Sequence, residues 1–187
     1  MTMEPVDHWI ASLEAFDARI GLIGPDDVTR PTPNPGWDVG RLVEHVVWFQ
    51  RVTVGQLLER PDVDSANITD PLAEWRAASS ALRAAVAADG ALDQHLDIPF
   101  GDGPLRTSIM VPTVDLLFHT WDLARALGVD DTLPEATCAA VYEAMLPFDE
   151  AIRRSTGAYP DGYADKIEPP PNADIQTRLL CFAGRQQ

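Results

Sequence analysis

Asp115 and His119 are two residues whose types and spacing suit metal binding, and both lie in the apolar segment at residues 114–126. If this segment is helical, the two side chains lie four residues apart on one face, on adjacent turns. A carboxylate and an imidazole held in this way can bind a divalent metal ion, but such a site needs at least one more ligand. The third ligand must therefore come from another part of the chain.

His45 is the predicted third ligand. Of the other histidines, His8 lies close to the N-terminus, and His95 falls in an irregular connection with no carboxylate or histidine at helical spacing. His45 lies inside an apolar helical segment, where its ring nitrogens need hydrogen-bond partners or a metal. With Asp115 and His119 it supplies two imidazoles and one carboxylate. This set leaves coordination positions open for water or a substrate, as a catalytic metal site requires.

Simpler interpretations stay open for the residues of this region. His119 can be a buried core histidine that is hydrogen-bonded to Asp115. Trp48 and Trp121 can be ordinary core residues, and Arg41 can be a solvated residue of a first helical turn. Asp122 and Arg125 can form a local ion pair at helical spacing.

If the three residues do hold a metal, side chains on the same two segments are predicted to form its surroundings. Aromatic residues would supply an apolar wall, and Arg41 or Arg125 would meet a carboxylate of a substrate. The residues predicted to line a substrate or thiol pocket are Arg41, Trp48, Phe49, Trp121 and Asp122.

Four long helices are predicted to position these residues. Asp38 suits the N-cap of the second helix, and Gly128 suits the C-terminal end of the fourth. His45 therefore belongs to the second helix, and Asp115 and His119 belong to the fourth. Apolar residues recur at helical spacing over residues 5–22, 39–58, 71–90 and 112–127.

The remaining segments are predicted to be shorter. Residues 91–108 are interpreted as extended chain around a turn, either a short hairpin or an irregular loop. Residues 134–154 form a further helix with a kink at Pro147. A proline-rich tail at 158–172 packs a short closing helix at 173–184.

The pattern as a whole predicts an all-α fold, because four amphipathic helices with short connections and no strand alternation are typical of a helical bundle. A length of 187 residues indicates a single domain over residues 1–187. We expect a four-helix bundle with a short extra C-terminal helix and an irregular or hairpin connection before the fourth helix.

Charge and composition limit the partners and the compartment. A formal net charge of -15 argues against nucleic acid and anionic membrane surfaces as partners. Cys138 and Cys181 are too few for a disulfide scaffold, which fits a reduced cytoplasmic setting. We expect no signal peptide and no membrane span, since no apolar run approaches roughly 18 residues. Lys166 is the single lysine beside many arginines, which indicates a high-GC, actinobacterial source.

Three segments carry a resemblance to a known family. GWDVGRLVEH at residues 36–45 resembles the GW-x-V-x-x-L-x-x-H motif of the DinB-like superfamily, in particular of mycothiol-dependent maleylpyruvate isomerase N-terminal-type proteins. DLLFHTWDLARALG at residues 115–128 resembles the second signature of that group, a carboxylate-x-x-x-His followed by WDLARA-x-G. RLLCFAGR at residues 178–185 resembles its closing segment, so the resemblance spans essentially the whole chain.

The resemblance implies a DinB-like four-helix bundle with a divalent metal at one end. By motif position its ligands are His45, Asp115 and His119, and the metal is usually zinc (Zn²⁺), with Ni²⁺, Fe²⁺ and Mn²⁺ as alternatives. Enzymes of this group use mycothiol or bacillithiol as cosubstrate. The expected activity is that of a metal- and thiol-dependent S-transferase or isomerase acting on a small electrophile.

Two departures and several alternatives accompany this expectation. The isomerase has a glutamate where this chain has the shorter Asp115. The isomerase also has a C-terminal domain that contributes to its active site, and we expect no such domain here, so maleylpyruvate itself is not the expected substrate. A non-catalytic metal- or small-molecule-binding bundle, as a monomer or a homodimer, is the main alternative. A metal-dependent hydrolase and a non-haem iron oxygenase are weaker ones, the latter because two histidines and one carboxylate also form its iron site.

Overall fold

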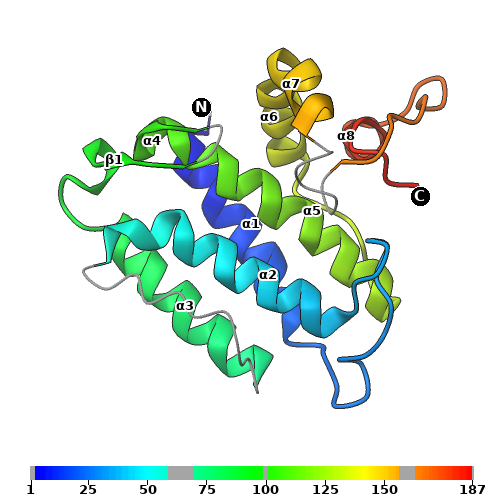
Figure 1. Cartoon of the computed structure of the whole chain (residues 1–187), viewed down its shortest axis with the longest axis horizontal. Helices are drawn as coiled ribbons and strands as arrows, with labels where there is room; N and C mark the ends of the chain where they lie inside the picture. Colours follow the sequence, from blue (N-terminus) through cyan, green and yellow to red (C-terminus); the bar gives the residue numbers. More distant parts are fainter. Residues whose placement is uncertain (1–2, 59–69, 99–100, 156–162, 187) are drawn as a thin grey trace.

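The computed structural model describes residues 3–58, 70–98, 101–155 and 163–186, and it is mostly helical. Its long helices lie side by side, with α1 packed along α5 and α2 packed against both α3 and α5 (Figure 1). The long helices are α1 (Pro5–Ile20), α2 (Val39–Val52), α3 (Pro71–Val86) and α5 (Met110–Leu127). The all-α prediction agrees with this arrangement.

Shorter elements complete the described chain. α6, α7 and α8 lie together on one side of α5 (Figure 1). The remaining elements are η1 (Val54–Leu57), η2 (Ala91–Asp93), β1 (His95–Leu96), β2 (Gly103–Pro104), α4 (Leu105–Ser108), α6 (Glu135–Met145), η3 (Leu146–Phe148), α7 (Asp149–Ser155) and α8 (Ile175–Phe182).

The termini of α2 and α5 follow from local chemistry. The Asp38 carboxylate accepts a 2.8 Å hydrogen bond from the Arg41 backbone N–H and so caps α2, as predicted. α5 ends where Gly128 adopts φ of 69°, a left-handed conformation that favours glycine. These two helices carry the predicted metal ligands, and local residues define the start of α2 and the end of α5.

α5 is buried on most of its circumference because two separate apolar clusters meet on it. Leu116 and Leu123 pack into the cluster formed with α1, α2 and α3. Leu117 and Trp121 pack into a second cluster with α6 and α8. Because α5 is covered on most sides, several of its polar side chains are also buried, and they need hydrogen-bond partners inside the protein.

Gln50 of α2 is a buried polar residue that joins three helices. Its side chain accepts a 3.0 Å hydrogen bond from Trp9 Nε1 of α1 and donates a 2.9 Å bond to the Pro112 carbonyl of α5. Gln50 has no exposed surface, and these two bonds satisfy its side-chain amide inside the protein. The contact thus links α2 to both α1 and α5.

The second helix ends earlier than predicted. α2 stops at Val52 instead of continuing to residue 58, and a short 3-10 turn, η1, follows it. The Phe49 carbonyl accepts both the Thr53 backbone N–H, at 3.1 Å, and the Thr53 hydroxyl, at 2.6 Å, so the last helical bond of α2 is shared with a side chain. Thr53 and its β-branched neighbours Val52 and Val54 also have lower helix propensity than the unbranched residues before them.

The connection before α5 is a small hairpin. β1 and β2 pair antiparallel, with His95 opposite Pro104. Residues 105–107 were predicted to be extended, which is wrong: they belong to α4, where Thr107 Oγ1 and Ser108 Oγ donate to the Pro104 carbonyl. The predicted kink at Pro147 is confirmed, because η3 separates α6 from α7 there.

The stretch at residues 164–167, which precedes α8, packs beside this helix and the residues that follow it. The Ile167 N–H donates to the Cys181 carbonyl at 2.9 Å. Gly184 has φ of 75°, and a Cβ there would lie 2.6 Å from the Ala164 side chain and 2.7 Å from the Asp165 carbonyl oxygen. Any side chain at position 184 would therefore force this segment away from α8. Residues 158–162 of the predicted tail lie outside the described residues.

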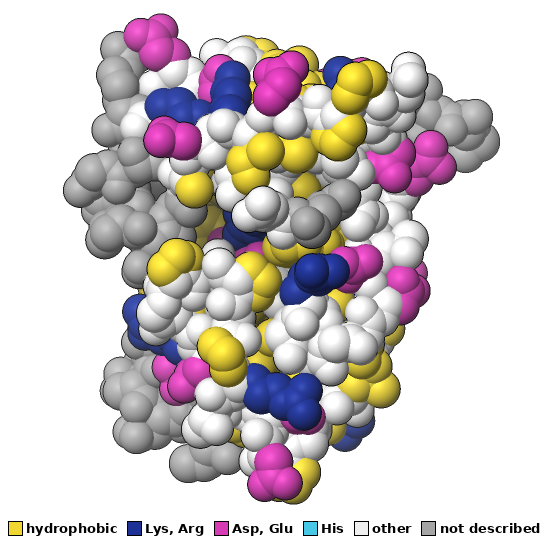
Figure 2. Space-filling model, turned by 90° about the vertical axis from the view of Figure 1, so that its right-hand side faces the viewer, with side chains coloured by type: hydrophobic (Ala, Val, Ile, Leu, Met, Phe, Trp, Pro, Cys, Tyr) yellow, Lys and Arg dark blue, Asp and Glu magenta, His cyan; other side chains and the backbone are white. Residues whose placement is uncertain are grey.

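The surface carries both signs of charge. On the face shown in Figure 2, basic and acidic side chains are interspersed, and no continuous basic area is visible on that face. Among the described helices, none combines the length and the apolar character that a membrane crossing needs.

Candidate metal centre

The three residues predicted as metal ligands lie together in the structure. His45 comes from α2, and Asp115 and His119 come from adjacent turns of α5. One ligand atom of each lies within 4.8 Å of the others. Asp115 Oδ1 is 3.0 Å from His45 Nε2 and 3.4 Å from His119 Nε2. Both imidazoles therefore present the same ring nitrogen to one carboxylate.

Both imidazoles meet the same oxygen of Asp115, Oδ1, and leave its other oxygen free for a ligand. Asp115 Oδ2 is buried and has no hydrogen-bond partner among the described residues. A buried carboxylate oxygen without a partner costs free energy, unless an ion or a water binds it. The His45 and Asp115 side chains keep 22% and 15% of their surface exposed, so a small ligand can reach them from solvent. The residues present thus fit a divalent ion.

The charges of the three residues are coupled. Burial alone would raise the pKa of Asp115, but the charges of His45 and His119 and their hydrogen bonds outweigh it and hold this pKa well below its usual range. Burial would lower the pKa of His119, yet the Asp115 carboxylate, with help from Asp122, raises it to about 9. At neutral pH the metal-free pair is therefore a carboxylate beside an imidazolium.

Asp122 orients the His119 ring. Its Oδ2 lies 3.1 Å from His119 Nδ1, so the Nδ1–H donates to this carboxylate and Nε2 faces Asp115. A histidine ligand is commonly oriented in this way by a carboxylate on its other nitrogen. Asn34 Nδ2 also donates to Asp122 Oδ2, at 3.2 Å.

The partner of Asp122 differs from the local one considered from the sequence. Asp122 is fully buried and pairs with Arg185, not with Arg125. Arg125 extends to the surface and pairs with Asp131 at 3.3 Å. Burial would raise the pKa of Asp122, but the Arg185 guanidinium outweighs this and lowers it. Asp122 therefore orients a predicted ligand and does not line an open pocket.

The other predicted pocket residues fall into two groups. Phe49 stacks on His45 with ring centroids 5.9 Å apart, and Trp48 is 37% exposed beside it. Arg41 is exposed, with its guanidinium carbon 5.4 Å from the Trp37 ring centroid. Trp121 is 1% exposed within the second apolar cluster, which agrees with its interpretation as a core residue and not with a pocket wall.

Sequence reasoning assigned no role to Trp37, Asn34, Tyr163 and Arg185. Trp37 stacks on His119 at 5.6 Å between centroids and contacts His45 at 4.9 Å, so it covers both imidazoles. Trp37 and Arg185 stand inside the quoted motifs, but spacing alone cannot show which side chain they contact. Contacts of this kind are visible only once the loop before α2 and the C-terminal segment are folded.

The other two histidines lie outside this cluster. His8 Nδ1 is 3.2 Å from Thr137 Oγ1 at the contact of α1 with α6. His95 pairs with Asp102 on the exposed hairpin, at 2.6 Å. Of the four histidines, His45 and His119 are thus the two that share a carboxylate at the α2–α5 contact.

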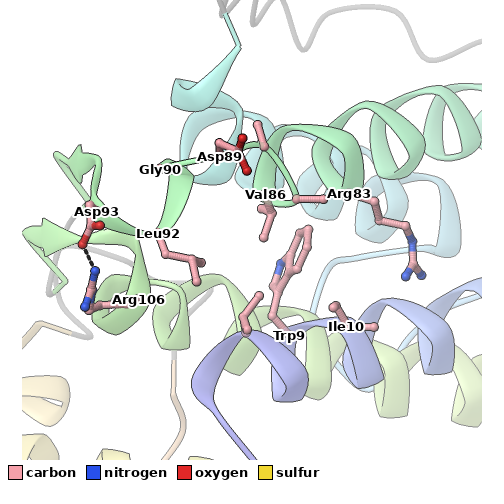
Figure 3. A pocket seen from close by; sticks show the side chains of 12 residues that line it. Trp9, Ile10, Arg83, Val86, Asp89, Gly90, Leu92, Asp93 and Arg106 are labelled. Atoms are coloured by element: carbon pink, nitrogen blue, oxygen red, sulfur yellow. Dashed lines mark ion pairs between the residues drawn. The ribbon is translucent and has the colours of Figure 1, made fainter.

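A cavity of about 570 Å³ lies elsewhere in the protein, between the start of α1, the end of α3 and η2. Figure 3 shows Trp9 of α1 pointing toward Val86 of α3 in this cavity, with the Asp93–Arg106 ion pair at its edge. None of the three predicted metal ligands lines it. The candidate metal centre is therefore separate from this cavity.

Comparison with known proteins defines the class of the chain. Residues 9–124 match the family described as the mycothiol maleylpyruvate isomerase N-terminal domain, and the chain belongs to this family, within the DinB-like superfamily. The resemblance inferred from the motifs is thereby confirmed. The match contains His45, Asp115, His119 and Asp122, whereas Arg185 lies outside it.

Two relatives in Mycobacterium tuberculosis are similar along the full chain. They are the uncharacterized protein MT0763 of strain CDC 1551 / Oshkosh and the uncharacterized protein Rv0738 of strain ATCC 25618 / H37Rv. Each is 29% identical over 184 residues, which cover 98% of this chain and 98% of the relative. No solved structure matches the chain at a significant level.

Proposed function

We propose that this chain is a single-domain, divalent-metal-binding helical bundle that uses a low-molecular-weight thiol, mycothiol, in an S-transfer or isomerisation of a small electrophile. The family supports the mycothiol relation. In this proposal α1, α2, α3 and α5 are the four helices of a DinB-like bundle, and His45, Asp115 and His119 are the metal ligands. Zinc is the proposed ion, with Ni²⁺, Fe²⁺ and Mn²⁺ as alternatives.

The observation that carries the proposal is the unpartnered Asp115 Oδ2 beside two imidazole Nε2 atoms. A purely structural hydrogen-bond network would be expected to satisfy a buried carboxylate oxygen. Two imidazoles and one carboxylate also leave coordination positions free, which is typical of catalytic rather than structural zinc sites.

The chain's own residues define what a substrate would meet. A zinc ion bound there would supply a Lewis acid that holds a thiol sulfur as its thiolate. Trp37 stacks on the His119 ring and Phe49 stacks on the His45 ring, so each covers one face of an imidazole. Arg41 lies one turn before His45 on α2 and offers a cation to a carboxylate of the electrophile. Asp122 keeps His119 Nε2 directed at the Asp115 side.

The test is a pair of titrations on chelator-treated protein, first with zinc and then with mycothiol. We expect one zinc per chain, and a further rise of the melting temperature with mycothiol only in the zinc form. A ligand at 100 times its Kd adds about 2.7 kcal/mol, which equals roughly 5–10 °C for a chain of this size. Absence of stoichiometric metal binding would refute the proposal. Zinc binding without any mycothiol effect would favour the non-catalytic alternative.

The same donor set also suits a non-haem iron oxygenase, so this second candidate needs its own experiment. Protein loaded with Fe²⁺ under anaerobic conditions is exposed to oxygen in the presence of candidate substrates. Stoichiometric oxygen uptake by the iron form would support the oxygenase, and its absence together with thiol binding by the zinc form would support the transferase or isomerase.

Zinc affinity is expected to rise with pH. Because the pKa of His119 is raised to about 9 without metal, this imidazole is protonated at neutral pH, and metal binding must release its proton. Each released proton makes the Kd fall about tenfold per pH unit below that pKa. Competition titrations at several pH values between about 6 and 8 measure the slope. A Kd that is independent of pH would contradict metal binding by His119.

A further inference from the structure

The buried ion pair between Asp122 and Arg185 is the feature that the proposed function leaves unexplained. Arg185 Nε and a terminal nitrogen lie 2.9 and 2.8 Å from the two oxygens of Asp122, which makes the pair bidentate. The Arg185 side chain is 10% exposed, and the Asp122 side chain has no exposed surface. A pair this deeply buried is seldom worth its desolvation for stability alone, so its location calls for another reason.

The pair is directly connected to the candidate metal centre. Arg185 binds Asp122, Asp122 Oδ2 accepts from His119 Nδ1–H, and His119 Nε2 faces Asp115. Each link in this series of contacts spans 3.4 Å or less. A change at Arg185 is therefore transmitted to the ring orientation of a predicted ligand through one intervening side chain.

Arg185 is itself held rigidly. Its backbone N–H donates to the Leu180 carbonyl at 2.9 Å, and the preceding Gly184 takes the left-handed conformation that ends α8. The guanidinium carbon lies 4.6 Å from the ring centroid of Phe118, the residue before His119. Planar stacking and a two-point hydrogen bond leave the guanidinium little freedom, and a lysine amine offers neither.

The C-terminal segment also brings a second residue to this region. The Tyr163 ring packs edge-on against Phe118, with centroids 5.8 Å apart. Tyr163 and Arg185 thus both contact Phe118 on α5, although neither belongs to the part of the chain that matches the family at residues 9–124. The described C-terminal segment, residues 163–186, therefore covers the Asp122 side of the candidate site.

We propose that Arg185 is a positioning residue of the metal centre: through Asp122 it fixes the orientation of His119, so that the C-terminal segment completes a site whose ligands all lie in the matched region. The inference rests on the proposed metal-binding function. Without Arg185 the buried carboxylate loses its bidentate partner and must turn toward another group. The hydrogen bond that orients His119 is then lost or distorted.

The test compares zinc binding by Arg185→Met with that by Arg178→Met. Arg178 is a matched control, because it is also an arginine of the C-terminal region that lies over an aromatic ring, Tyr142, at 4.9 Å, but away from Asp122. We expect Arg185→Met to weaken zinc binding about 10- to 100-fold, the usual loss when the partner that orients a ligand is removed. Arg178→Met is expected to bind zinc like the unmodified protein.

A second variant and a spectroscopic readout separate positioning from stability. The double variant Asp122→Asn with Arg185→Met leaves no orphaned charge and should fold, yet it should still bind zinc weakly because His119 lacks its carboxylate partner. Long-range ¹H–¹⁵N spectra of the zinc form should show His119 protonated at Nδ1 in the unmodified protein. This signature should be altered in both variants and partly restored in Arg185→Lys.

The outcomes distinguish the two proposals. If the unmodified protein binds no zinc, the proposed function fails and this inference fails with it. If the unmodified protein binds zinc, and Arg185→Met shows the same Kd and the same His119 signals, the inference alone is overturned.

Discussion

Replacing His119 by alanine is expected to remove stoichiometric zinc binding. The substitution deletes one of three predicted ligands and leaves Asp115 and His45, which are too few to hold the ion tightly. We expect the Kd for zinc to rise by much more than about 100-fold, because even a residue that only orients a ligand is typically worth 10- to 100-fold. Metal analysis after dialysis and a competition titration with a chromogenic chelator measure this change. His45→Ala should behave in the same way.

His8→Ala is the matched control for this experiment. His8 is 7% exposed and His119 is 6% exposed, so both substitutions remove a buried imidazole from a helix. His8 bonds Thr137 and lies outside the candidate centre. If His8→Ala lost zinc to the same degree as His119→Ala, the loss would reflect damaged folding. Retained zinc binding in His119→Ala would show that this imidazole is not a ligand.

Replacing Asp115 by asparagine is expected to have the second largest effect. The change keeps the size of the side chain but removes the only carboxylate among the three predicted ligands. A neutral amide is a weaker zinc ligand, and the two imidazoles lose the charge between them, so we expect the Kd to rise by about 100-fold or more. The zinc-dependent rise in melting temperature should shrink accordingly, which differential scanning calorimetry can measure.

Asp115→Glu and Asp102→Asn complete that comparison. Glutamate keeps the charge and extends the reach, as in the isomerase that the motif resembles, so it should retain zinc binding far better than asparagine. Asp102 pairs with His95 at 2.6 Å on the hairpin and serves as a carboxylate–imidazole control away from the centre. Equal zinc affinity in Asp115→Asn and in the unmodified protein would exclude Asp115 as a ligand.

Much of the secondary structure was predictable, because its signals are local. Asp38 caps α2 and Gly128 ends α5 through contacts with residues close in sequence. The end of α2 was misplaced, because apolar periodicity continues past Val52 and carries no sign of the 3-10 turn that follows it. The three candidate ligands were predicted from residue type, helical spacing and the apolar surroundings of His45, and the motif resemblance indicated the same three residues.

Only the tertiary structure decided which partners these candidate residues have. From the sequence, Asp122 had Arg125 as its apparent partner at helical spacing, but the folded protein places Arg185, 63 residues away, against it. Arg125 faces solvent on α5, while Asp122 faces the interior toward the segment after α8. Spacing along one helix identifies which side chains can meet. Burial determines which side chains need a partner, because a fully buried carboxylate requires a buried cation or hydrogen-bond donor. The chain by itself therefore determines its helices and the residue types of a candidate metal site, whereas the packing of its last residues on α5 determines how His119 is held.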